Sequence, residues 1–152
     1  MAKYITPTLT ITSNAYDAAT NPGPTSSPQN VSVTDLLDVT EVSTKIVDSS
    51  ATHSILFNHE DYVSSSAPTI GTDGGFIFLK NLTLGLATTA DIYIGHGSSG
   101  ALEGDTATRL MTLKPGEFAF FGWDMQTDII LDSSAAISGA LEAVLFVRTG
   151  TE

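Results

Sequence analysis

The chain has no cysteine, and only six of its 152 residues are lysine or arginine. Without cysteine it forms neither a disulfide nor a thiolate metal site, which excludes zinc fingers, thiol enzymes and Cys-ligated clusters. Seventeen acids give a formal net charge of −11. The bases are scattered singly along the chain, whereas nucleic-acid binding needs a basic patch that releases counterions. We therefore expect no nucleic-acid partner, and an acidic surface equally disfavours anionic membranes.

Long hydrophobic runs are also missing, since no apolar stretch approaches the ~20 residues that span a bilayer. Residues 1–7 (MAKYITP) lack the apolar region of a secretory signal peptide. We expect the protein to be made in the cytosol and to stay there unless it leaves within a larger particle. At 152 residues one folded domain is the expectation, because domains cluster near ~100–150 residues.

The first thirty residues differ in composition from the rest. Residues 3–13 alternate between Ile5, Leu9 and Ile11 on one side and threonines on the other, which predicts a strand, and Pro7 makes it an edge strand or extended arm. Residues 14–30 are rich in Pro, Ser and Asn, as in a flexible linker. We predict an N-terminal strand or arm with its linker over 1–30, and a β-domain over 31–152. An ordinary first strand followed by a long surface loop is the alternative.

Short β-type runs separated by turn residues fill the remainder. Strands are predicted over residues 41–47, 53–58, 76–81, 91–94, 109–113, 117–123, 127–132 and 141–148. The run over 76–81 (FIFLKN) is almost continuously apolar, which is typical of a strand buried on both faces. Residues 91–94 (DIYI) alternate instead, so we expect Ile92 and Ile94 to point inward and Tyr93 to point outward. This pattern predicts an all-β antiparallel sandwich, either jelly-roll or immunoglobulin-like, with an extended N-terminal arm.

Two local signals are more specific. Lys114-Pro115-Gly116-Glu117 has the composition of a type II turn, so we predict a hairpin between the strands on either side of it. Residues 34–39 (TDLLDV) offer a cap-like start and predict one short helical turn. Residues 135–145 are rich in alanine and admit a helix, but Gly139 and the β-branched residues nearby favour a strand.

The candidate chemical sites are weak. Residues 95–100 (GHGSSG) match the glycine pattern of dinucleotide sites, but the next residues do not open the helix that such a site needs, so a connecting loop is favoured. His59-Glu60-Asp61 is the single His–carboxylate cluster, and no histidine pair has metal-ligand spacing. We expect no cofactor, no metal and no catalytic residues.

Carboxylates offer two further possibilities. Asp124 and Asp128 could be imagined as a glycosidase pair, and a solvated acidic face is the simpler interpretation. Acids also gather near Asp35, Asp38 and Glu41, but without the glycine-containing loop of a calcium site. A carbohydrate-binding module would need an exposed aromatic platform, for which the candidate residues are Trp123, Tyr62, Tyr93 and Phe121.

Four segments of the chain carry a family resemblance. They are residues 75–83 (GFIFLKNLT), 90–95 (ADIYIG), 113–117 (LKPGE) and 141–146 (LEAVLF). Their style and order resemble those of small β-sandwich virion proteins of tailed bacteriophages, over about the last half of the chain. The resemblance implies a non-enzymatic structural protein, foremost a capsid cement or decoration protein that binds and stabilises the major capsid lattice. A tail, collar or fibre component is the alternative in this class.

What the resemblance implies sets the remaining expectations. The partners would be the major capsid protein or other virion proteins, the chain would be a homo-oligomer, and it would reside in the virion after assembly in the host cytoplasm. An N-terminal strand on a long tether can add to a neighbour's sheet edge, where backbone hydrogen bonds give affinity. The predicted protein-interaction residues are therefore those of the arm, namely Tyr4, Ile5, Leu9 and Ile11.

Overall fold

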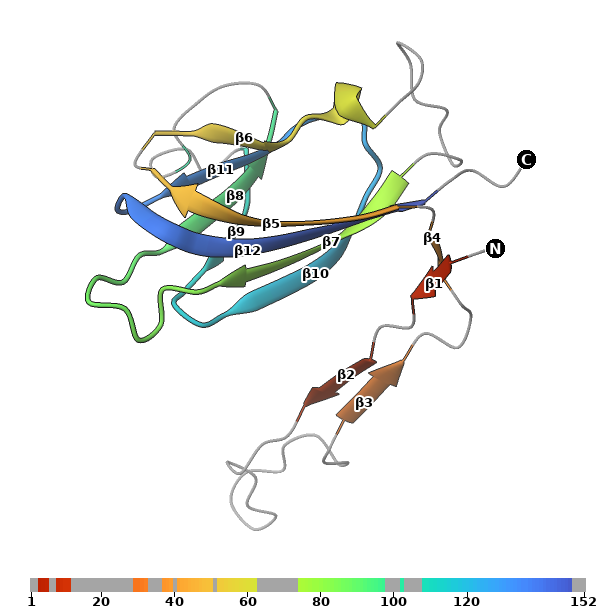
Figure 1. Ribbon diagram of the computed structural model, residues 1–152, viewed down its shortest axis with the longest axis horizontal. Helices are drawn as coiled ribbons and strands as arrows, with labels where there is room; N and C mark the ends of the chain where they lie inside the picture. Colours follow the sequence, from red (N-terminus) through yellow and green to blue (C-terminus); the bar gives the residue numbers. More distant parts are fainter. Residues whose placement is uncertain are drawn as a thin grey trace. The chain divides into compact units, whose positions relative to one another are not determined.

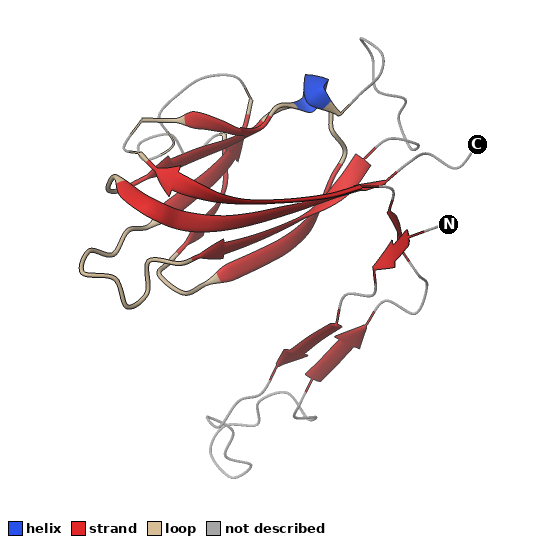
Figure 2. Cartoon of the chain, in the orientation of Figure 1, coloured by secondary structure: helices blue, strands red, loops and turns tan. Residues whose placement is uncertain are grey.

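The computed structural model describes residues 3–5, 8–11, 29–32, 37–39, 41–50, 52–62, 74–97, 102 and 108–148. The chain divides into two compact units, residues 1–38 and 39–152, which are treated separately below. Strands make up nearly all the regular structure of the described residues, and the one helical element is a 3-10 turn, η1 (His59–Asp61) (Figure 2). The prediction of an all-β protein is confirmed.

The larger unit consists of two four-stranded antiparallel sheets (Figure 1). One has the order β10-β7-β12-β5, and the other has the order β6-β11-β8-β9. The bounds are β5 (Glu41–Ser49), β6 (Ser54–Phe57), β7 (Gly74–Asn81), β8 (Ile92–His96), β9 (Arg109–Leu113), β10 (Phe118–Trp123), β11 (Ile129–Ser133) and β12 (Ile137–Arg148). Each predicted strand between residues 41 and 148 has its counterpart here, and residues 137–148 form a strand rather than a helix.

The eight strands pair in a nested order. β5 pairs with β12, β6 with β11, β7 with β10, and β8 lies beside β9. The first strand thus meets the last, the second meets the second from last, and so on inward to the central pair. Two further pairings, β12 with β7 and β11 with β8, join these nested pairs into the two sheets. The arrangement is that of one long antiparallel ribbon rolled up on itself.

Both sheets contribute to one core. Ile77 and Leu79 of β7 and Leu141 and Leu145 of β12 pack in the same cluster as side chains of β6, β8 and β11. Ile92 and Ile94 are fully buried there, as their alternation predicted. This shared core gives the unit a sandwich-like architecture in which each sheet has one inner face and one outer face.

The turn at residues 114–117 is confirmed, but the predicted hairpin is wrong. Gly116 has φ +83°, and the N–H of Glu117 donates to the carbonyl of Lys114 at 2.9 Å, as a type II turn requires. However, β9 pairs with β8 and β10 pairs with β7, so the turn leads from one sheet to the other. The local signal identified the turn correctly, but it carries no information about which strands then pair.

The smaller unit contains two two-stranded pairings. β1 (Lys3–Ile5) lies beside β4 (Leu37–Val39), and β2 (Thr8–Ile11) pairs antiparallel with β3 (Gln29–Ser32). Two strands therefore replace the single strand predicted over residues 3–13. The helical turn predicted over 34–39 is wrong for residues 37–39, whose backbone pairs with β1. The predicted linker lies largely outside the described residues.

Candidate interaction surface

The outer face of the β10-β7-β12-β5 sheet is the most unusual surface of the larger unit. Residues directly opposite each other in an antiparallel ladder point to the same face. The register places Phe78 beside Phe120 on one side and beside Val144 on the other, and Val144 beside Thr44. The next row is Gly122, Phe76, Phe146 and Val42, and the row on the other side is Phe118, Lys80, Glu142 and Ile46. We call these twelve positions the Phe face.

Eight of these positions carry large apolar side chains, and five of the seven phenylalanines in the chain are among them. Phe118 is 53% exposed, Phe120 39%, Val42 48% and Ile46 58%. An antiparallel sheet with one face on the core is expected to present polar residues on the other. The Phe face departs from that rule, and its contiguous exposed apolar surface makes it a candidate contact site.

The phenylalanines of this face contact one another. The rings of Phe76 and Phe120 stack with centroids 5.7 Å apart and an interplanar angle of 6°, and those of Phe78 and Phe118 stack at 6.2 Å. Phe120 also meets Phe146 edge-on, at 6.4 Å. These diagonal contacts place the rings in a continuous layer against the sheet.

This surface was not anticipated from the sequence. The apolar run over residues 76–81 predicted a strand buried on both faces, but only its Ile77 and Leu79 side lies in the core. Phe76 and Phe78 lie on the outer side and are only partly covered. The sequence signal for this face was the spacing Phe-x-Phe, which occurs in both β7 and β10. Residues two apart on a strand share a face, so this spacing places the rings of each strand on one side.

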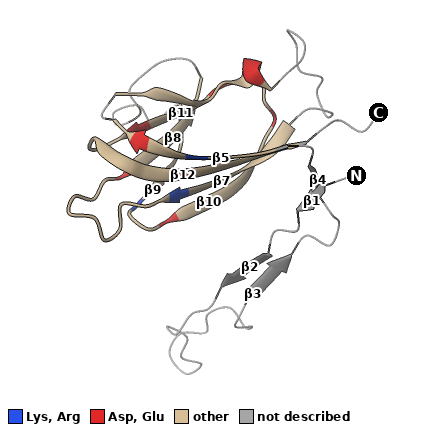
Figure 3. Cartoon of the chain, in the orientation of Figure 1, with Lys and Arg blue, Asp and Glu red and all other residues tan. Residues whose placement is uncertain are grey.

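Charge on the Phe face is low for so acidic a chain. Its twelve positions hold one base, Lys80, and one acid, Glu142, which are direct neighbours in the ladder. Figure 3 shows the strands of this sheet mostly without charge, with a basic residue at the arrowhead of β7. The face is therefore neutral overall in a protein of formal net charge −11.

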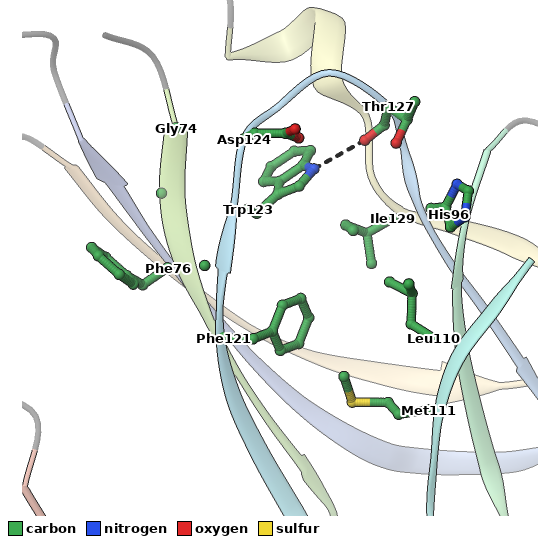
Figure 4. Close-up of a pocket in the computed structure, with 12 residues that line it drawn as sticks. Gly74, Phe76, His96, Leu110, Met111, Phe121, Trp123, Asp124, Thr127 and Ile129 are labelled. Carbon is green, nitrogen blue, oxygen red and sulfur yellow. Dashed lines mark hydrogen bonds between the residues drawn. The ribbon is translucent and has the colours of Figure 1, made fainter. Parts of the chain in front are cut away.

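A cleft of about 710 Å³ lies between the two sheets beside the edge strands β9 and β10. Phe121, Met111 and Ile129 point into it, whereas Phe76 points away on the other side of β7 (Figure 4). Trp123 closes one end of β10, where its indole Nε1 donates to the carbonyl of Thr127 at 3.0 Å. The lining is mainly apolar, which suits the binding of a nonpolar group rather than acid–base chemistry.

His59 and Asp128 form the one close His–carboxylate pair of the described residues. His59 Nδ1 lies 2.7 Å from Asp128 Oδ1, and the backbone N–H of His59 donates to the same oxygen at 2.9 Å. Burial raises the pKa of Asp128, but the side-chain and backbone hydrogen bonds from His59 outweigh it and lower the pKa overall. The pair ties η1 to the start of β11, and we assign it a structural role.

The other predicted candidates do not assemble into a chemical site as far as the structure describes them, and the side chains of Asp35, Asp38 and Glu41 lie outside that description. Gly95 lies within β8, where an added Cβ would come within 2.6 Å of Leu102 Cδ2 and 2.7 Å of the Thr108 carbonyl. The glycine is thus explained by the packing of Leu102 over the strand. Asp124 Oδ1 accepts from the backbone N–H of Gln126, whereas Asp128 Oδ1 is engaged by His59. Among the described residues no three His, Asp or Glu side chains are grouped closely enough to hold a metal ion.

The proposed carbohydrate platform is not exposed. Trp123 is only 6% exposed and Tyr93 only 8%, and Tyr93 packs against Leu102 and Ile130 beneath the guanidinium of Arg109. Tyr62 meets Trp123 edge-on at 6.0 Å, so both rings belong to one internal cluster with Phe57. Tyr93 had been expected to face outward, and it does leave the main core, but a second small cluster covers it.

The predicted interaction residues of the N-terminal arm lie on two strands. Tyr4 and Ile5 belong to β1, and Leu9 and Ile11 belong to β2. Leu9 lies opposite Val31 and Ile11 opposite Gln29 in the ladder with β3. Their side chains lie outside what the structure describes.

Comparison with protein families, curated proteins and solved structures yields no match for this chain. Within the described residues, no helix is long and apolar enough to cross a membrane.

Proposed function

We propose that this chain is a non-enzymatic structural protein of a virion, foremost a capsid cement or decoration protein. The observation that carries the proposal is the Phe face, a neutral apolar surface on the outer side of a sandwich-like domain. Such surfaces are characteristic of protein–protein contacts. The choice of a virion protein among proteins with such surfaces rests on the resemblance of the second half of the chain to small virion proteins of tailed bacteriophages.

The nested strand order supports the jelly-roll alternative for the fold over the immunoglobulin-like one. Rolling up one antiparallel ribbon of eight strands yields the orders β10-β7-β12-β5 and β6-β11-β8-β9. Immunoglobulin constant domains instead divide seven strands between sheets of four and three. Jelly rolls occur in viral capsid proteins, lectins and cupins, so the fold agrees with the proposal without selecting it.

The N-terminal unit supports the second part of the proposal, an arm that adds to a neighbouring sheet. An isolated two-stranded ribbon is marginally stable in water, because it lacks a third strand and a face to cover it. The described pairings β2–β3 and β1–β4 have two strands each. Joining a neighbour's sheet edge through Tyr4, Ile5, Leu9 and Ile11 would stabilise the ribbon, and lattice symmetry would multiply such weak contacts.

Sedimentation tests this function directly. Heads that lack the chain, from the phage that encodes it, are mixed with increasing amounts of the purified protein and pelleted through a cushion. We expect saturable binding at a fixed number of copies per capsid protein. Deletion of residues 1–21 tests the arm: equally tight binding by a folded truncated chain would contradict it. Failure of the intact protein to pellet with heads would refute the cement role.

A matched pair of variants tests the Phe face in the same assay. Phe118→Asp with Phe120→Asp introduces charge at the two exposed phenylalanines on β10, the edge strand of the face, whereas Leu84→Asp with Leu86→Asp introduces it at exposed leucines in the connection after β7. Binding should fall at least tenfold for the first pair and stay within about twofold for the second. Equal losses in both would remove the Phe face from the proposal.

A further inference from the structure

The two halves of the Phe face differ in both size and charge. The half formed by β10 and β7 carries four phenylalanines and the base Lys80. The half formed by β12 and β5 carries the smaller Val42, Thr44, Ile46 and Val144, together with Phe146 and the acid Glu142. The larger side chains and the positive charge therefore lie on one side of the β7–β12 boundary. The smaller side chains and the negative charge lie mostly on the other side.

A surface of this kind is complementary to itself. Consider a twofold axis in the plane of the interface that runs along the strands between β7 and β12. The axis sets each residue opposite its own ladder partner in the second copy, so Lys80 meets Glu142 and Phe78 meets Val144. On the outer strands, Phe118 meets Ile46, which occupies the same row. Isologous dimers require this reciprocity, in which residue i contacts j and j contacts i.

We propose that the Phe face binds a second copy of this chain, sheet against sheet, about that twofold axis. The inference rests on the proposed role of the face as a protein-contact surface, and it names a second copy as the partner. The weaker head binding expected of the Phe118 and Phe120 variants then follows from the lost avidity of the dimer for the capsid lattice. The ion pairs of the described residues are His59–Asp128 and Lys114–Asp91, so neither Lys80 nor Glu142 forms an ion pair with another described residue. In the dimer, Lys80 of each copy would lie opposite Glu142 of the other copy, which gives two symmetry-related ion pairs.

The neutrality of the face favours a second copy over a charged partner. Two chains of formal net charge −11 repel each other over most of their surfaces. They can approach closely only through a face that carries no net charge, and the Phe face has one base and one acid. A partner recognised by charge would instead require a face with an excess of one sign.

The area of the Phe face sets the expected affinity of the dimer. Four strands about 4.8 Å apart, and three rows of side chains two residues apart, cover roughly 20 by 20 Å, or about 400 Å² per copy. Standard stable interfaces bury about 800 Å² per partner, so this dimer should be reversible. Its mass must therefore be followed across a range of concentrations, from roughly 1 µM to 500 µM.

Charge reversal provides the test. In solutions of the full-length protein, sedimentation equilibrium gives the dissociation constant of the wild type, of Lys80→Glu and of Glu142→Lys. Each single change sets like charges face to face in the dimer, so we expect each to weaken dimerisation at least tenfold. The double variant exchanges the two signs and should return to within about threefold of the wild-type constant. Urea denaturation of every variant checks that it is folded.

Mixing the two single variants distinguishes a lost charge pair from damage to the fold. One variant then carries two acids at these positions and the other carries two bases, so each repels itself and attracts the other. Native mass spectrometry, with one variant labelled with ¹⁵N, should show a mixed dimer at concentrations where each variant alone is monomeric. A change that merely damaged the fold would not be rescued by mixing.

Three results would overturn the inference: a monomeric wild type throughout the range, single variants that dimerise like the wild type, or a mixture that forms no mixed dimer. A monomer that still pellets with heads through the Phe face would assign that face to the capsid protein. That result would leave the proposed function standing. A dimer that does not bind heads would refute the cement role and leave the interface in place.

Discussion

Asn81 offers the sharpest test of how the two sheets are held together. Its side chain is fully buried and uses its whole hydrogen-bonding capacity. Nδ2 donates to the carbonyls of Ala90 at 2.8 Å and Leu113 at 2.9 Å, and Oδ1 accepts from the N–H and the hydroxyl of Thr83 at 2.9 and 2.7 Å. One amide at the end of β7 thus ties the approach to β8 and the end of β9 to the opposite sheet.

Asn81→Asp changes this junction without changing its shape. The carboxylate keeps the two acceptor bonds, but it removes both amide donors, leaves the Ala90 carbonyl only the longer contact of 3.2 Å with the Thr83 hydroxyl, and sets a negative charge against two buried carbonyls. Each buried carbonyl left without a donor costs about 1–3 kcal/mol, and an uncompensated buried charge adds to this. We expect a loss of about 3–5 kcal/mol at pH 7, a large part of the 5–15 kcal/mol that stabilises a typical domain.

The loss should also depend on pH. Burial raises the pKa of the introduced carboxyl above its unfolded value, so the folded variant binds a proton more readily than the unfolded chain. Its stability therefore falls as pH rises from the unfolded pKa toward the folded one. At pH 4 the protonated group can donate to one of the two carbonyls, and part of the deficit should be recovered.

Urea denaturation followed by the fluorescence of Trp123, the single tryptophan, measures both effects. Asn58→Asp is the matched control, because Asn58 only accepts a hydrogen bond, from the N–H of Glu60 at 3.0 Å, and aspartate caps equally well. We expect less than about 0.5 kcal/mol of change there. A loss below about 1 kcal/mol for Asn81→Asp, or one independent of pH, would refute the reasoning.

Three further predictions concern single positions. Gly95→Ala should destabilise the fold by about 1–3 kcal/mol in the same urea assay, because its Cβ would collide with Leu102 and with the backbone carbonyl of Thr108; an unchanged midpoint would contradict the packing role of this glycine. Gly116→Ala should cost about 1–2 kcal/mol, since φ at Gly116 is +83°, and a stabilised variant would argue against that turn. Hydrogen bonds from the Gly139 N–H and the Ser138 hydroxyl lower the pKa of Asp48 below 3.8. That contribution is present above the unfolded pKa and is lost as pH falls through the lower folded pKa, so on acidification wild type should lose stability more steeply than Asp48→Asn, and parallel pH profiles would exclude the effect.

Local patterns in the sequence located the strands but not their partners. The alternation at residues 91–94 identified β8 and its inward isoleucines, and Lys114-Pro115-Gly116-Glu117 identified a turn, because both depend on neighbouring residues. The assignment of β9 and β10 to different sheets depends on contacts with β8 and β7, which no local pattern encodes. The predicted hairpin failed for that reason.

The Phe face illustrates the same limit for function. Phe76 and Phe78 share a side of β7 by their spacing, and Phe118 and Phe120 share a side of β10. Whether that side faces the core or the solvent is decided by the neighbouring strands, and an apolar side is more often an inner one. Only the register across all four strands reveals that these rings lie together on the outside.

The central claim is that the chain is a structural component of a virion. Quantitative mass spectrometry of purified particles of the tailed phage proposed to encode it tests this most directly, with isotope-labelled peptides of the chain and of the major capsid protein as standards. We expect a ratio of the two proteins that is the same in every preparation and corresponds to a fixed number of copies per particle. A variable trace amount, or none, would contradict the claim.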